Sequence, residues 1–110
     1  MKSTVWITQQ RQGLDYEPAR EFGEILFCLD GRVHPADTHE IFRIALQVAK
    51  EWNSEDILLP VSSTTSTVFV LALGILLFQR GVNSIKMLVH DAKTNQYRER
   101  KMHFNGNDQL

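Results

Sequence analysis

The chain has 110 residues, of which 43% are hydrophobic and 23% are charged, and its net charge is −1. This composition excludes a chain that is disordered throughout, and the charge balance argues against a global electrostatic grip on DNA, RNA or an anionic membrane. The length fits a single α/β domain, which we place at 1–104, followed by a frayed tail at 105–110. The apolar run Val68–Phe78 is shorter than the roughly 20 residues that span a bilayer, and the start of the chain lacks a signal-peptide pattern, so we expect a soluble cytoplasmic protein.

The first quarter of the chain predicts two strands and a polar connection. Thr4–Gln9 is rich in β-branched and aromatic residues, which is typical of a strand. The connection Gln10–Gly23 is polar, and Pro18 favours one helical turn within it. Glu24–Leu29 is almost continuously apolar, which indicates a central strand covered on both faces. Its one cysteine, Cys28, is the only cysteine in the chain, and we interpret it as a buried structural thiol.

A first long helix is predicted from about Asp37 to about Trp52. Asp37 followed by Glu40 matches a capping-box-like start. Apolar residues then recur at spacings of three and four, which predicts one buried face. That face comprises Ile41, Ile44, Ala45, Val48, Ala49 and Trp52.

The stretch from Asp56 to Val89 predicts a βαβ unit, around which the rest of the chain is organised. Ile57–Val61 is a buried strand, and a helix starts within Ser63–Thr67 and ends at Gly81, a residue suited to the position after a helix. Ser84–His90 is the next strand. A hairpin then leads to Tyr97–Phe104, whose charges suit an exposed edge strand. The predicted fold is therefore a Rossmann-like α/β domain of about five strands and two main helices, with a C-terminal antiparallel hairpin.

The second helix has no polar face between Val68 and Phe78. A helix that is apolar all round needs cover on several sides, more than one small sheet supplies. We therefore predict a homodimer or other homo-oligomer with this helix near the interface.

The hydroxyl-rich turn Ser62–Thr67 is the strongest site candidate. It follows the carboxyl end of a predicted parallel strand and opens a helix, where free amides and the helix dipole favour anions. We predict an anionic, nucleotide-type ligand there. The turn lacks the glycines of a phosphate-binding loop, so a purely structural capping cluster is the alternative. The candidate ligand-binding residues are Ser62, Ser63, Thr64 and Thr65, with Gln9, Gln10 and Arg11 from the end of the first strand.

His90 is a further candidate because it ends a strand at the same predicted sheet edge. It offers a general base for a phosphodiesterase-like enzyme, although an exposed polar residue explains it as well. We assign no catalytic residue, and an enzymatic function is the less favoured interpretation. The spacing of His34 and His39 fits no established metal motif, so we predict no metal and no cofactor.

Two stretches resemble known families. Asp15-Tyr-Glu-Pro-Ala-Arg-Glu-Phe-Gly-Glu-Ile-Leu-Phe resembles a pattern in small uncharacterised α/β proteins of phage and bacterial genomes. Leu58–Lys101 is similar in layout to small Rossmann-like CRISPR-associated proteins, which pair two subunits around a cyclic oligonucleotide. The second resemblance implies a ligand site at Ser62–Thr67 and Gln10–Gln12.

Three functions follow as hypotheses. The first is a dimeric binding module for a nucleotide-type ligand. The second is a phage- or bacteria-encoded protein-interaction module without a small ligand. The third is a phosphodiesterase-like enzyme. The sequence leaves the ligand, the protein partner and the host undetermined.

Overall fold

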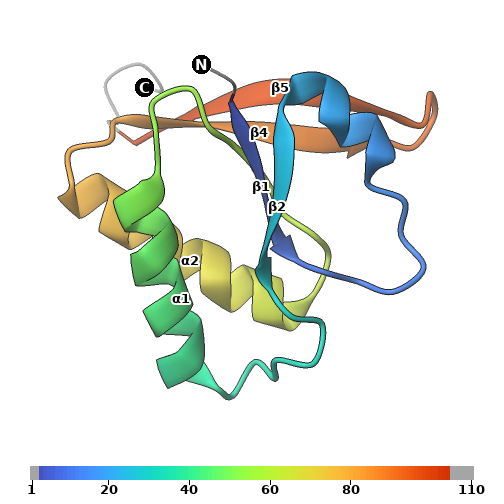
Figure 1. Cartoon of the computed structure of the whole chain (residues 1–110). Helices are drawn as coiled ribbons and strands as arrows, with labels where there is room; N and C mark the ends of the chain where they lie inside the picture. The colour runs from blue at the N-terminus through green and yellow to red at the C-terminus, as the bar shows by residue number, and fades with distance from the viewer. Residues whose placement is uncertain (1–2, 105–110) are drawn as a thin grey trace.

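A computed structural model describes residues 3–104, which form an α/β domain built on one mixed sheet (Figure 1). The strand order is β2-β1-β3-β4-β5, with β1 to β4 parallel and β5 antiparallel to β4. This confirms the predicted fold class, including the C-terminal hairpin. In chain order the elements are β1 (Thr4–Gln9), η1 (Glu17–Phe22), β2 (Glu24–Leu29), α1 (Thr38–Glu51), β3 (Ile57–Leu59), α2 (Thr64–Gln79), β4 (Ser84–Asp91) and β5 (Gln96–His103). The predicted tail at 105–110 lies outside the described residues.

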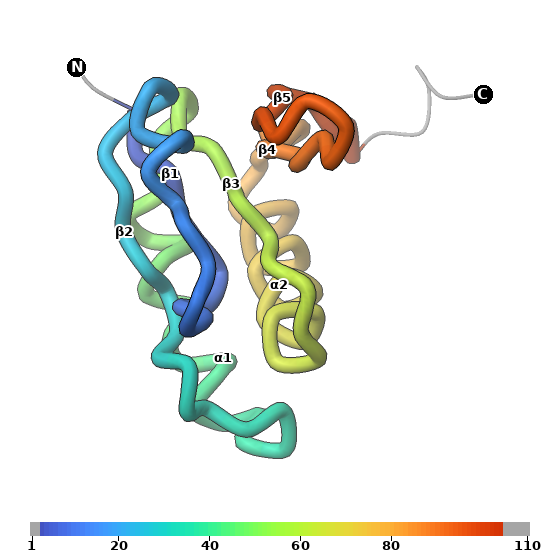
Figure 2. The backbone as a smooth tube through the Cα atoms, turned by 90° about the vertical axis from the view of Figure 1, so that its right-hand side faces the viewer, coloured from blue at the N-terminus to red at the C-terminus, as the bar shows by residue number. Residues whose placement is uncertain are grey.

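The sheet is covered on both faces. The long helices α1 and α2 lie beside each other on one face, and the short helix η1 covers part of the other face (Figures 1 and 2). Because neighbouring residues of a strand point to opposite faces, β1 contributes to both cores. Its Trp6 packs with α1 and α2, whereas Val5 and Ile7 pack with Ala19 of η1.

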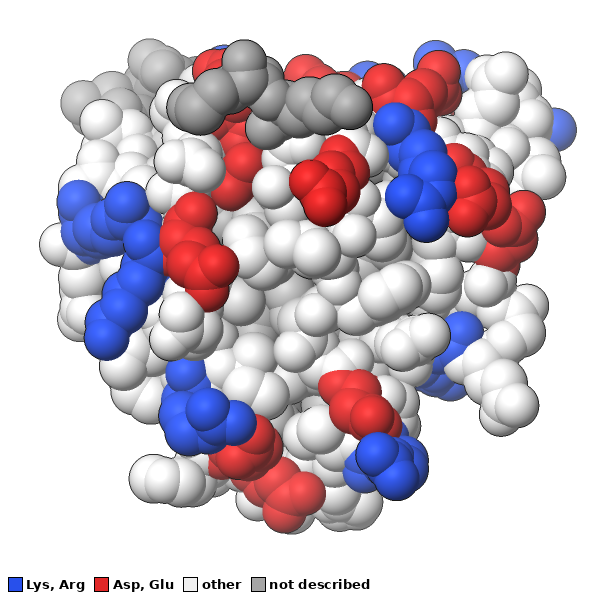
Figure 3. All heavy atoms as spheres, viewed as in Figure 1, with Lys and Arg blue, Asp and Glu red and all other residues white. Residues whose placement is uncertain are grey.

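β2 is an edge strand, so the prediction of a central strand covered on both faces is wrong. The apolar run was a sound sign of a strand, but β1 pairs with β2 on one side and with β3 on the other, which leaves the outer edge of β2 unpaired in the described chain. Leu26 and Phe27 are 41% and 40% exposed. Figure 3 shows a largely uncharged area where β2 crosses this face, with most charged side chains around it.

The two long helices begin differently. Asp37 precedes α1, but its carboxylate accepts no hydrogen bond from the helix and instead accepts one from the amide of His34 at 3.4 Å. The predicted capping box is therefore wrong, because the loop geometry directs Asp37 back toward His34. α2 has a true cap: the hydroxyl of Ser63 accepts a bond from the amide of Ser66 at 3.0 Å. It ends before Gly81, whose φ of +97° confirms the predicted stop.

A buried carboxylate fixes the amino ends of β1 and β3. Asp56 is 2% exposed and directly precedes β3. Its two oxygens accept bonds from the indole nitrogen of Trp6 at 2.9 Å and from the amides of Thr4 at 3.1 Å and Asn53 at 2.9 Å. The end of α1 and the start of two strands therefore meet at one side chain.

Candidate functional site

The predicted site residues lie at the carboxyl ends of β1 and β3, where the direction of the strand order reverses. The chain steps from β1 to β2 on one side and then crosses to β3 on the other side of β1. In open α/β sheets the crevice at such a switch point is the usual place for a ligand. Sequence reasoning therefore placed the cluster at the end of the sheet where binding is expected.

The side chains of Ser63 and Thr65 in the hydroxyl-rich turn form hydrogen bonds within the protein. Ser63 donates its hydroxyl to the side-chain oxygen of Gln9 at 2.7 Å while it caps α2. Gln9 is 2% exposed, and its amide donates to the carbonyls of Asp30 at 3.1 Å and Val33 at 3.4 Å. Thr65 is buried and donates to the same carbonyl of Val33 at 3.0 Å. Gln9, Ser63 and Thr65 therefore hold β1, α2 and the loop after β2 together.

Thr8 and Ser66 complete this polar core. The sequence did not indicate that these two residues would form a pair. Their hydroxyls lie 2.6 Å apart and are fully buried. Thr8 also accepts a bond from the amide of Val61 at 3.0 Å, just beyond the end of β3. Thr8 lies two residues after Trp6 and so shares its buried face of β1, which could have indicated a buried threonine, but nothing in the sequence identified its partner 58 positions away.

The remaining predicted residues border two surface depressions. Arg11 donates to the carbonyl of Ser62 at 2.9 Å, so the ends of β1 and β3 are joined here as well. Gln10 and Arg11 line a depression of about 640 Å³ together with Arg32. Thr64 is exposed at the start of α2.

Ser62 and His90 line a neighbouring depression of about 430 Å³ with Tyr16 and Tyr97. The Nε2 atom of His90 lies 2.9 Å from the side-chain oxygen of Asn95, and its ring packs edge-on against Tyr97. Desolvation by burial raises the pKa of Tyr97 above its usual value.

One of the two arginines in this region, Arg32, already pairs with a carboxylate. Arg32 binds the carboxylate of Asp30 at 3.0 Å. The hydrogen bond from the Arg32 side chain lowers the pKa of that carboxyl, so the pair remains ionised and its charges offset each other. Arg11 is therefore the cation best placed to meet an anion. Within residues 3–104, no group of three or more His, Cys, Asp or Glu side chains is arranged to hold a metal ion.

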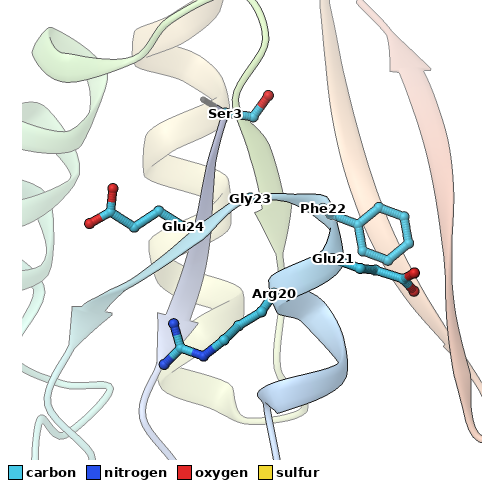
Figure 4. Close-up of a pocket in the computed structure, with 6 residues that line it drawn as sticks. All are labelled: Ser3, Arg20, Glu21, Phe22, Gly23 and Glu24. Atoms are coloured by element: carbon cyan, nitrogen blue, oxygen red, sulfur yellow. The ribbon is translucent and has the colours of Figure 1, made fainter. Parts of the chain in front are cut away.

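A depression of about 540 Å³ lies at the opposite end of the sheet, between η1 and β2. The side chains of Arg20, Glu21 and Glu24 point in different directions rather than toward a common centre (Figure 4). Arg20 also pairs with Glu17 at 2.7 Å. This depression offers no convergent chemistry.

An exposed apolar surface lies on the side of the domain that carries α1 and α2, and we call it the α2 surface. Its members are Phe42 of α1, Leu71, Ile75 and Phe78 of α2, and Met102 of β5, each between 48% and 67% exposed. Leu71 and Ile75 line grooves on both sides of α2, which makes the surface continuous. Thr64–Gln79 contains no charged residue.

Comparison with known proteins gives one finding. The family model described as "Phage Pam3 gp32-like protein" matches residues 3–104. Neither the curated proteins nor the solved structures contain a match. No helix among residues 3–104 has the length and apolarity needed to cross a membrane. The family match supports the predicted phage resemblance and gives no support to the CRISPR-associated one. Because the match covers nearly the whole sequence, the chain belongs to the phage Pam3 gp32-like protein family.

Proposed function

We propose that this phage-family protein is a protein-interaction module that docks through the α2 surface. The observation that carries the proposal is the exposure of five large apolar side chains around a helix that has no charged residue. A contiguous apolar surface of this kind on a folded domain is typical of a protein-binding site. The polar cluster at the switch point supports the same proposal, because its side chains are engaged in holding the fold.

The apolar groups also explain how such a module would bind. Burying exposed side chains removes apolar area from water, which favours association without requiring a charged partner. Aromatic and methionine side chains are enriched at the centres of interfaces, and Phe42, Phe78 and Met102 supply them here. We therefore expect association to weaken little with added salt.

A second candidate function is the binding of an anionic, nucleotide-type ligand at the switch point. The observation that favours it is the position of Arg11 and Tyr16 beside the depression at the carboxyl ends of β1 and β3. Tyr16 accepts a bond from the amide of Arg11 at 3.1 Å. A phosphate could meet Arg11, and an aromatic ring could stack against a base. The internal bonding of Ser63 and Thr65 weakens this candidate, because their hydroxyls are already used.

Photo-crosslinking tests the first proposal directly. A benzophenone amino acid replaces Leu71 on the α2 surface or, as a matched control, Leu26 on the exposed edge of β2. In the bacterial cells that express the protein, we expect covalent protein adducts from position 71 and none from position 26. The absence of any adduct from position 71 would refute docking through the α2 surface.

A thermal-shift screen against mono-, di- and cyclic nucleotides separates the second candidate. A ligand that binds only the folded chain raises its melting temperature. If the protein is an interaction module without a small ligand, we expect no nucleotide to change its melting temperature. A shift that disappears in Arg11→Ala would favour the ligand-binding function instead.

A further inference from the structure

We infer that the partner of the α2 surface is a second copy of this chain, packed about a two-fold axis with α2 against α2. This inference rests on the proposed function and names the partner of the same surface. Three properties of the surface favour a second copy: its area, the glycine at its centre and its lack of charge.

The area matches what a stable dimer needs. The five side chains of the α2 surface are about half exposed, which leaves roughly 550 Å² of apolar area in contact with water if a fully exposed large side chain presents about 200 Å². This value lies near the upper end of the largest apolar patch on a typical monomer, about 300–600 Å². A standard interface buries roughly 800 Å² per partner, of which about 65% is apolar in homodimers, so an apolar area of about 550 Å² fits an interface of that size.

No contact within residues 3–104 explains Gly74. A Cβ atom built on it meets nothing within 4 Å, so none of its neighbours in this part of the chain requires a glycine. Glycine within a helix costs about 1 kcal/mol relative to alanine. Gly74 lines the groove beside α2 and lies one turn from both Leu71 and Phe78. A glycine there lets the backbone of a second helix approach closely. No helix within residues 3–104 makes such an approach.

The sequence of the helix suits a two-fold axis. If the axis passes between Gly74 and Ile75 with the two helices antiparallel, Leu71 faces the partner's Phe78 and Phe78 faces the partner's Leu71. A two-fold interface places the same surface on both subunits, so a charged side chain close to the axis would lie next to its own copy. α2 carries no charge, and this repulsion is therefore absent.

Sedimentation equilibrium of the purified chain and three variants tests the inference. The wild type is expected at twice the chain mass of 12.7 kDa. Leu71→Glu is expected to be a folded monomer, because the change lies on an exposed position and buries a charge only in the dimer. Leu26→Glu is the matched control on β2 and is expected to remain a dimer. Far-UV circular dichroism confirms that each variant is folded.

Gly74→Leu supplies a second, independent variant. A Cβ atom at this position meets nothing within 4 Å among the described residues, and a leucine side chain would project from the groove lining and block the close approach of a second helix. We expect the dimer dissociation constant to rise at least about tenfold, while the monomer stays folded and gains helix propensity. An unchanged dimer in this variant would overturn the helix crossing at Gly74.

Failure of this inference and of the proposed function can be told apart. A wild-type chain that is monomeric at about 50 µM would overturn the second copy as partner. A dimer that dissociates in Leu26→Glu but persists in Leu71→Glu would overturn it as well. In either case, position 71 crosslinking to a protein of a different mass leaves the interaction module standing. Loss of every adduct from position 71 removes both.

Discussion

Replacing Asp56 with alanine is expected to destabilise the fold by about 3 kcal/mol. The carboxylate accepts three hydrogen bonds, all from donors that lie in or next to the core. The indole N–H of Trp6 is then left buried without a partner, which costs about 1–3 kcal/mol. The amides of Thr4 and Asn53 are only partly buried, so water can reach them, and each loses about 0.5–1 kcal/mol. The sum would lower the melting temperature by roughly 10–20 °C in a domain of this size.

Urea denaturation monitored by tryptophan fluorescence measures this cost. Asp56→Asn keeps the shape and one acceptor oxygen, so we expect it to lose about half as much stability as Asp56→Ala. Glu55→Ala is the matched control: it removes a neighbouring carboxylate that is 73% exposed and pairs with Lys86 at 2.9 Å. We expect no resolvable change from it. A loss below about 1 kcal/mol in Asp56→Ala would refute the claim that this carboxylate joins β1, α1 and β3.

Three further predictions concern single positions. Thr8→Val keeps the strand shape but removes the acceptor of the Val61 amide, so urea denaturation should show a loss of about 1–3 kcal/mol; an unchanged midpoint would contradict this. Gly23→Ala should reduce the yield of folded protein sharply, because its Cβ would lie 2.3 Å from the backbone oxygen of Ser3; a wild-type melting temperature would show that the strands shift freely. Burial raises the pKa of the Cys28 thiol to about 12, so the reactive thiolate is scarce at pH 8, and alkylation should be at least about 100-fold slower than in urea; equal rates in the folded and unfolded protein would exclude a desolvated thiol.

The candidate site shows where sequence reasoning succeeds and where it stops. Ser63 could be predicted near the start of α2, because a hydroxyl beside an apolar helix is a local signal. Its bond to Gln9 could not be predicted, because the two residues are 54 positions apart and meet only when β1 and β3 pair. The same holds for Thr8 and Ser66. Local chemistry therefore identified a polar cluster, and the fold decided which groups its hydroxyls bind.

Two expectations failed because they read a local pattern as a tertiary one. The apolar residues of β2 indicated a strand with cover on both faces, but strand order depends on the crossovers and placed β2 at the edge. Asp37 and Glu40 matched a helix cap in spacing, but the preceding loop turned Asp37 toward His34. Spacing along the chain fixes neither the position of a strand in a sheet nor the direction of a loop.

By itself, the sequence determined the identity of the elements, because hydrophobic periodicity, β-branched runs and glycine stops act within a few residues. It also determined that α2 lacks a polar face. Only the tertiary structure decided which of these apolar groups remain in contact with water. Leu73 and Leu77 are fully buried against the sheet, whereas Leu71, Ile75 and Phe78 of the same helix are exposed. The physical reason is that a helix beside one sheet and one neighbouring helix is covered on only part of its circumference, and the uncovered part of α2 supplies Leu71, Ile75 and Phe78 to the α2 surface.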